Sequence, residues 1–196
     1  MRILEHPASG SKKFGSKRAD HGDKNPEKER QLNLFSVGRI LQLHPHSPFE
    51  KALKMDENGN VAAAKSLYHK AVEADDMPAD AYCNLGILES QAGNTAKAIN
   101  YLTLSLKHNP RHLEAHFNLA NLFVEVGNLD LGILHYEVCT EIKPEFSNSY
   151  FNLGLCLAEA DRYDEAIEVF DKYCRLVSPE EREPAMELIE KLRAMG

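Results

Sequence analysis

The sequence predicts an all-α protein in which helical hairpins stack into a solenoid. The first observation is a short phrase that returns every 34 residues: AYCNLGI begins at residue 81, AHFNLAN at 115 and SYFNLGL at 149. The second is that apolar residues recur at three- and four-residue spacing on both sides of a turn within each interval, which indicates two amphipathic helices. One hairpin of this kind cannot cover its own apolar face, so neighbouring hairpins must stack.

The 34-residue interval divides the chain into blocks 45–78, 79–112, 113–146 and 147–180. Residues of the same type recur at equivalent positions of these blocks. The aligned columns are Leu85, Leu119 and Leu153; Ala52, Gly86, Ala120 and Gly154; Gly59, Gly93, Gly127 and Asp161; Ala64, Ala98, Gly132 and Ala166; and Tyr68, Leu102, Tyr136 and Phe170. The two columns of small residues indicate that two helix backbones approach closely. The column of turn glycines predicts a left-handed helix stop followed by a tight turn.

Serine and proline mark both ends of the array. The run SPFE at 47–50 provides an N-cap serine, a proline at the first helical position and a capping-box glutamate. The run SPEE at 178–181 repeats this logic and predicts a last helix that reaches about Met195. Pro184 leaves open whether this helix begins or bends there. We expect residues 181–196 to cap the fourth block.

The N-terminal part of the chain has a different composition. Residues 1–30 hold eight basic and five acidic residues and few apolar ones, so we expect a disordered, mildly basic tail. Residues 31–44 are expected to form an apolar linker or short helix. The remaining 166 residues carry 15 basic and 25 acidic groups, a net charge of −10. Nucleic acid is therefore an improbable partner on charge grounds.

No motif of the chain points to an enzyme. There is no Gly-rich phosphate loop, nucleophile elbow or pair of carboxylates on facing elements, so we expect no catalytic residue, no cofactor and no small-molecule substrate. No apolar run reaches the length of a membrane span, and the first residues lack the apolar core of a secretion signal. We expect a cytoplasmic protein without a membrane segment. The four cysteines lack metal-ligand spacing and fit a reducing compartment.

A metal site is also not expected. His112 and His116 lie four residues apart, a spacing that can chelate a metal on a helix face. His116 occupies a column that is aromatic in other blocks, however, and reads as a core residue. We find no cysteine or carboxylate that completes the set.

The columns together resemble the tetratricopeptide repeat, whose 34-residue consensus runs aromatic-x-x-Leu-Gly-x-x-Tyr, then Ala, Phe or Tyr, Ala and Pro. The second block matches with Tyr82, Leu85, Gly86, Ala98 and Pro110, and the fourth with Tyr150, Leu153, Gly154, Tyr163, Ala166, Ile167 and Phe170. The third block is looser, and the first is degenerate in its opening helix. The resemblance implies a right-handed superhelix of four helix-turn-helix repeats plus the capping helix. It also implies a scaffold for protein–protein interaction.

Three asparagines, Asn84, Asn118 and Asn152, precede the Leu-Gly or Leu-Ala pair in successive blocks. The resemblance places this column on the wall of a concave groove. An exposed asparagine lowers helix propensity, so three in register suggest a compensating role. Their amides can bond the backbone of an extended peptide, and the column resembles the asparagine ladder of the O-linked N-acetylglucosamine transferase superhelix. The alternative is that each amide only bonds the neighbouring helix.

The resemblance also predicts the surroundings of this asparagine column. Other groove positions are Cys83, Ile87, Phe117, Asn121, Phe151 and Leu155, with Asp80, Glu114, Glu125 and Glu159 at the margins. Family members that bind C-terminal carboxylates use lysine and arginine, but here the matching columns hold Phe49, Glu114 and Asn118. We therefore expect a protein or peptide partner that is polar or basic.

Two alternatives to this peptide-binding role remain open. The array could be an assembly spacer whose groove holds its own segment 32–43 or another copy of the chain. A weaker alternative comes from Gln31, Leu32, Asn33, Leu34 and Phe35, which resemble the peptide that bacterial proteins insert into the DNA sliding clamp. That segment is more simply interpreted as part of an apolar linker helix.

Overall fold

The computed structural model describes residues 47–195, and within that range all regular secondary structure is α-helical. The helices are α2 (Pro48–Glu57), α3 (Val61–Glu73), α4 (Pro78–Gln91), α5 (Thr95–His108), α6 (Leu113–Glu125), α7 (Leu129–Ile142), α8 (Ser147–Glu159), α9 (Tyr163–Leu176) and α10 (Pro179–Arg193). The predicted tail 1–30, the linker 31–44 and the motif at 31–35 lie outside the described residues.

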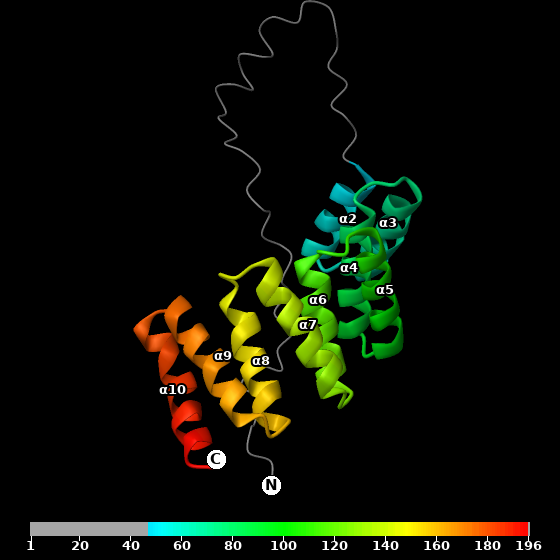
Figure 1. Ribbon diagram of the computed structural model, residues 1–196. Helices are drawn as coiled ribbons and strands as arrows, with labels where there is room; N and C mark the ends of the chain where they lie inside the picture. Colours follow the sequence, from blue (N-terminus) through cyan, green and yellow to red (C-terminus); the bar gives the residue numbers. More distant parts are fainter. Residues whose placement is uncertain (1–46, 196) are drawn as a thin grey trace, which may run out of the picture.

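Helices that follow one another in the chain also pack side by side. The hairpins are α2–α3, α4–α5, α6–α7 and α8–α9, and each packs on the next through its second helix. Helix α10 packs on α9 at the far end of the row (Figure 1). Contacts that run almost entirely between sequence neighbours are the property of a solenoid. The predicted all-α solenoid is therefore confirmed for the described part of the chain.

The hairpin turns adopt the left-handed conformation predicted for them. Gly59, Gly93 and Gly127 have φ of 73°, 76° and 80°, and Asp161 takes the same place in the fourth hairpin with φ of 59°. Aspartate tolerates this conformation better than most residues, which explains how the glycine can be absent there.

The two predicted serine caps are both present. The Ser47 hydroxyl accepts a hydrogen bond from the Glu50 N–H at 3.2 Å, and the Glu181 carboxylate accepts one from the Ser178 N–H at 3.1 Å. Helix α10 begins at Pro179 and continues through Pro184, so a start at Pro184 is excluded. The carbonyl that Pro184 leaves without a helical partner belongs to Glu180, an exposed residue, and water can bond it.

The columns of small residues let the helices of a hairpin approach each other closely. A Cβ added at Gly154 would lie 2.7 Å from the ring of Phe170, a fully buried side chain. The third hairpin reverses the arrangement, with Ala120 in the first helix and Gly132 in the second. A Cβ added at Gly132 would lie 2.5 Å from Val124. Gly154 and Gly132 must therefore remain glycine, because a packed core does not absorb an extra carbon without shifting.

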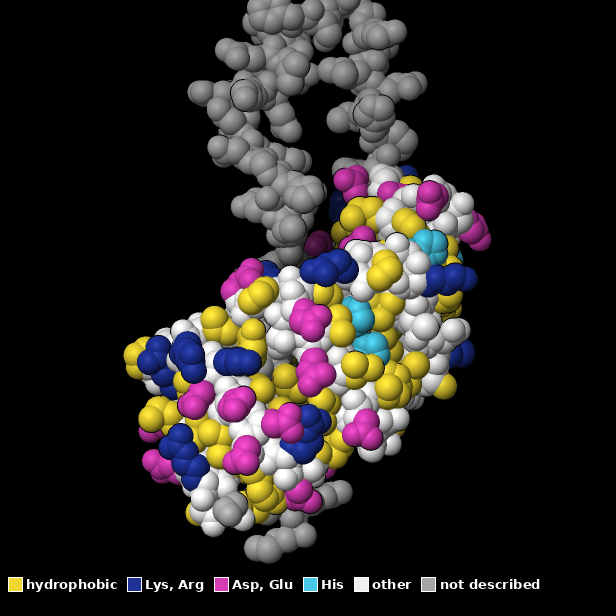
Figure 2. All heavy atoms as spheres, in the orientation of Figure 1, with side chains coloured by type: hydrophobic (Ala, Val, Ile, Leu, Met, Phe, Trp, Pro, Cys, Tyr) yellow, Lys and Arg dark blue, Asp and Glu magenta, His cyan; other side chains and the backbone are white. Residues whose placement is uncertain are grey.

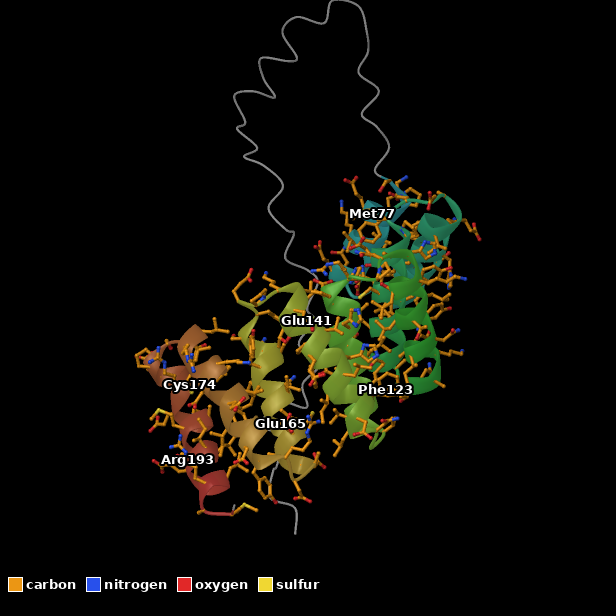
Figure 3. All side chains as sticks on the ribbon, viewed as in Figure 1. Met77, Phe123, Glu141, Glu165, Cys174 and Arg193 are labelled. Carbon is orange, nitrogen blue, oxygen red and sulfur yellow. The ribbon has the colours of Figure 1, made fainter. Side chains whose placement is uncertain are left out.

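A pair of histidines joins α6 to α7. His116 is buried, as the sequence predicted, and its Nε2 donates to the Pro110 carbonyl at 3.0 Å. Its Nδ1 must then accept from the Nδ1–H of His135 at 2.8 Å. The His135 ring stacks on Phe123, with centroids 5.5 Å apart. Histidine side chains lie together over α6 and α7 in Figure 2, and Figure 3 labels Phe123 beside them.

We predict that His135 makes the stability of the fold pH-dependent. Burial, followed by the proximity of His116, lowers its pKa to about 4 from a usual 6.5. As the pH falls from 6.5 towards 4, the unfolded chain binds a proton that the folded chain does not, so the free energy of unfolding decreases. Urea unfolding between about pH 7 and about pH 5 measures this slope.

The variant His135→Gln keeps an N–H donor but does not titrate, so its slope should be shallower than that of the wild type. Replacing the exposed His69 with glutamine is the matched control and should leave the slope unchanged. Equal slopes for wild type and His135→Gln would contradict the prediction.

Candidate functional site

The candidate binding surface lies on the first helices of the hairpins. We call it the first-helix surface and define it by Asn84 on α4, Asn118 on α6 and Asn152 on α8, together with the side chains around them. All three asparagines are half-buried. Helices α4 and α6 also contact each other directly, although they belong to different hairpins. The surface is therefore continuous between the second and third hairpins.

Two of the three amides are oriented by hydrogen bonds within the protein. Asn152 donates from Nδ2 to the Tyr136 hydroxyl at 3.3 Å, on the second helix of the preceding hairpin. Asn84 lies next to the buried hydroxyl of Tyr68, which occupies the same column as Tyr136. The residue in that column before Asn118 is Leu102, which has no hydroxyl. Asn118 instead donates to the carbonyl of Glu114, one turn earlier in its own helix, at 2.7 Å.

The amide oxygens remain available. Within residues 47–195, the hydrogen bonds of Asn118 and Asn152 use only their N–H groups. Asn121 is different, because its side-chain oxygen accepts from the hydroxyl of Tyr136. The scaffold thus fixes the nitrogen end of two amides and leaves the oxygen end free to accept an N–H group. Of the two bonds, only that of Asn152 joins a neighbouring helix, and contact of the column with a ligand stays a prediction.

The apolar groove positions lie deeper than expected. Cys83 is 1% exposed and packs in the core with Ala98 and Leu119. A partner peptide does not reach it in this structure, so the expectation that Cys83 contacts the peptide is corrected. Phe117 and Leu155 are also buried. The helical period sets the face on which a residue lies, but the depth of that face depends on how closely α4 and α6 approach.

Other predicted groove residues are more accessible. Ile87, Phe151, Asp80 and Glu114 are half-buried, and Asn121, Glu125 and Glu159 are exposed. The Phe151 ring packs against Phe170 and Tyr173, with centroids 5.8 Å and 5.1 Å away, which fixes its orientation. Accessible apolar area on the first-helix surface therefore comes mainly from Ile87 and Phe151.

Acidic groups gather between α4 and α6. Burial raises the pKa of the Glu114 carboxyl, Asp80 raises it further, and His112 opposes both effects. Burial raises the pKa of the Cys83 thiol well above its usual value, and the two carboxylates add to this. His112 Nε2 lies 3.4 Å from the Asp80 carboxylate. This part of the surface favours a positively charged neighbour.

One cluster of metal-ligating side chains was not predicted from the sequence. We expected no cysteine or carboxylate to complete a set with His112, and this is wrong: Cys83, His112 and Glu114 have ligand atoms within 4.8 Å of one another. His116, the expected partner of His112, bonds His135 and Pro110 instead. Cys83 is far from His112 in the chain and meets it only because the hairpins stack, so spacing gave no signal.

The described helices include none that is both long enough and apolar enough to span a membrane.

Comparisons with known proteins agree with this architecture. Family profiles described as "Tetratricopeptide repeat" match residues 50–104, 83–145 and 135–168. No match was found among curated protein sequences. The solved structure described as "YrrB: a TPR protein with an unusual peptide-binding site" is 19% identical, with a TM-score of 0.67, and the match covers 76% of this chain and 75% of that one.

Two further solved structures share the fold. MamA AMB-1 is 24% identical, with a TM-score of 0.62 and coverage of 75% of this chain and 81% of that one. A tetratricopeptide repeat protein from Parabacteroides merdae is 21% identical, with a TM-score of 0.67 and coverage of 75% and 59%.

We predict that Tyr136→Phe weakens the fold by removing the hydroxyl that Asn121 and Asn152 share. The free energy of unfolding should fall by about 0.5–1.5 kcal/mol, the usual net value of such a bond. Urea unfolding at neutral pH measures it. Tyr82→Phe is the control and should change stability by less than about 0.5 kcal/mol, because no described residue bonds the Tyr82 hydroxyl. Equal stability of the Tyr136→Phe variant and wild type would show that the hydroxyl does not hold the amides.

Proposed function

The chain is a member of the tetratricopeptide-repeat family, and we propose that its first-helix surface binds an extended segment of a partner protein. The family and the solenoid make it a protein–protein interaction module. What we add is the place and the manner of binding. The partner's backbone lies along α4, α6 and α8, and its N–H groups donate to the amide oxygens of the asparagine column.

The orientation of the amides is the observation that carries this proposal. A side chain held by its nitrogen end loses little conformational freedom when its oxygen accepts another bond, so binding is less opposed by entropy. Asn118 is informative, because it lacks a tyrosine partner and still keeps its oxygen free. An amide whose only role was to join helices would need a hydrogen-bond partner on the preceding hairpin, and Leu102 offers none.

The spacing of the helices suits an extended chain. Neighbouring packed helices lie roughly 8–10 Å apart, and an extended peptide advances about 3.3 Å per residue. Consecutive asparagines would therefore meet the peptide about every third residue. Bonds of about 0.5–1.5 kcal/mol each give only modest affinity. Selectivity comes from side-chain contacts, for which Ile87 and Phe151 offer accessible apolar area.

Charge narrows the class of partner. Asp80 and Glu114 lie on the surface itself, and Glu125 and Glu159 are exposed at the ends of α6 and α8. The chain as a whole carries a formal net charge of −7. A segment with lysine, arginine or neutral polar residues is attracted to such a surface, and an acidic one is repelled.

The asparagine column can be tested with a peptide selected on the protein itself. A displayed library of extended peptides of about 12 residues, long enough to cross three hairpins, supplies the probe. We expect the triple variant Asn84→Ala, Asn118→Ala, Asn152→Ala to bind the selected peptide at least roughly tenfold more weakly, because it loses three acceptors. Fluorescence anisotropy measures the affinity, and circular dichroism checks the fold.

The control replaces two exposed asparagines away from the first-helix surface, Asn58 and Asn100, with alanine and should bind normally. N-methylation of single peptide bonds in the probe adds a second readout. It should weaken binding at about every third residue in the wild type and have no such pattern in the triple variant. Unchanged affinity in the triple variant, or a library that yields no binder, would refute the proposal.

We also predict that charge at the surface margin favours basic peptides. The double variant Glu125→Gln, Glu159→Gln should bind a lysine-containing probe roughly two- to fivefold more weakly. The loss should shrink as salt rises from about 50 mM to about 500 mM, because salt screens exposed charges. Glu168→Gln with Glu190→Gln, on α9 and α10, is the control. A loss that does not depend on salt would show that the glutamates act by shape and not by charge.

A further inference from the structure

We propose that Cys83, His112 and Glu114, with Asp80 beside them, form a binding site for a divalent transition-metal ion, best matched by Zn²⁺, that ties α4 to α6. The ligand atoms of the first three residues lie within 4.8 Å of one another. The Asp80 carboxylate lies 3.4 Å from His112 Nε2 and adds negative charge beside these three residues. The site goes beyond the peptide-binding role and does not depend on it.

Two helices from different hairpins bring these side chains together. Asp80 and Cys83 are one turn apart on α4, so they point to the same side of that helix. His112 is the N-cap of α6 and Glu114 lies in its first turn. Because α4 and α6 contact each other directly, the ligand atoms of Cys83, His112 and Glu114 lie near one another in the folded chain.

The cluster itself is rich in acidic groups. Two carboxylates and a thiol surround one imidazole, and both Cys83 and His112 are buried. The buried carboxylate of Glu89, by contrast, is paired with Lys65 at 2.6 Å and with Asn94 at 2.7 Å. Asp80 and Glu114 are half-buried, and a carboxylate taken partly out of water likewise favours a positive partner. A divalent cation would supply it here.

The donor set selects the kind of ion. A cysteine thiolate together with an imidazole favours zinc and its relatives over magnesium or calcium, which prefer oxygen donors alone. Donor atoms around a tetrahedral zinc lie roughly 3.5 Å apart, since its bonds are about 2.0–2.3 Å long. Separations of up to 4.8 Å must therefore contract by at most about 1.3 Å, a change that side-chain rotation can provide.

Binding has structural costs: the buried Cys83 thiol must lose its proton, and His112 must give up two existing contacts, of which one is the Nε2 contact with Asp80. His112 Nδ1 accepts a hydrogen bond from the Ala115 N–H at 3.2 Å and so caps α6. When Nε2 binds a metal, the neutral ring carries its proton on Nδ1, and the cap is lost. One long capping bond is a small loss beside several metal–ligand bonds. Because Cys83 is 1% exposed, we expect slow exchange of the ion.

Cobalt(II) is a suitable probe, because coordination by a thiolate gives a charge-transfer absorption that imidazole and carboxylate ligands do not. The full chain, treated with a chelator and kept reduced, should develop this band at one equivalent of Co²⁺ and lose it when Zn²⁺ is added. Zinc should also raise the unfolding temperature. Absence of the band in the wild type would overturn the proposal.

Variants assign the ligands. Cys83→Ser should abolish the band, and His112→Asn should lower zinc affinity at least about tenfold while preserving the cap, since asparagine is itself a good N-cap. Glu114→Gln should weaken binding in the same direction. Cys174→Ser, on α9 and labelled in Figure 3 far from α4, is the control and should behave as wild type. A band that persists in a folded Cys83→Ser protein would place the ion elsewhere; if Cys83→Ser does not fold, unchanged zinc affinity in His112→Asn overturns the site.

Discussion

One large side chain on the second helix of each hairpin governs how the hairpins stack. Tyr68 meets Phe49 of its own hairpin and lies beside Asn84 of the next. Tyr136 likewise meets Phe117 of its own hairpin and bonds Asn152 of the next. These side chains are almost completely buried, and so are Leu102 and Phe170 in the same column. Because a hairpin cannot bury its apolar face alone, this shared column sets the position of each first helix relative to its neighbour.

The chemistry of that column also decides what the asparagines do. A tyrosine there offers a hydroxyl to the amide of the next hairpin, as Tyr136 does for Asn152. Leucine offers none, and Asn118 turns to its own backbone. In both cases the nitrogen end of the amide is occupied and the oxygen end is not. The core residue Tyr136 therefore orients Asn152, one of the groups that we propose to contact a ligand, while Asn118 is oriented by its own helix. Stacking and binding are linked through a single position of the repeat.

The sequence predicted what depends on local periodicity and missed what depends on contact between hairpins. Apolar spacing, small residues and turn glycines are features within one hairpin, and the 34-residue interval repeats them along the chain. The structure confirms the helices and turns that they predict. Cys83 lies on the expected side of α4 but is buried, because its depth is set by α6. The meeting of Cys83 with His112 likewise arises between hairpins. No period or spacing in a single chain encodes such a distance, so only the assembled solenoid shows it.

The asparagine column and the metal-ligating cluster share α4 and α6, and this makes their ligands interdependent. Asp80 and Glu114 contribute to the negative charge near Asn84 and Asn118. Glu114 is also one of the three metal-ligating residues, and Asp80 pairs with His112, another of them. A divalent ion would neutralise charge that attracts a basic peptide, while fixing the distance between the two helices that carry the amides. Linkage is reciprocal. A basic peptide whose affinity depends on the free carboxylates must therefore weaken binding of the ion. A neutral peptide whose affinity depends only on the fixed distance between α4 and α6 must strengthen binding of the ion. The sign of the coupling therefore reports which property of this surface, its charge or its geometry, dominates recognition.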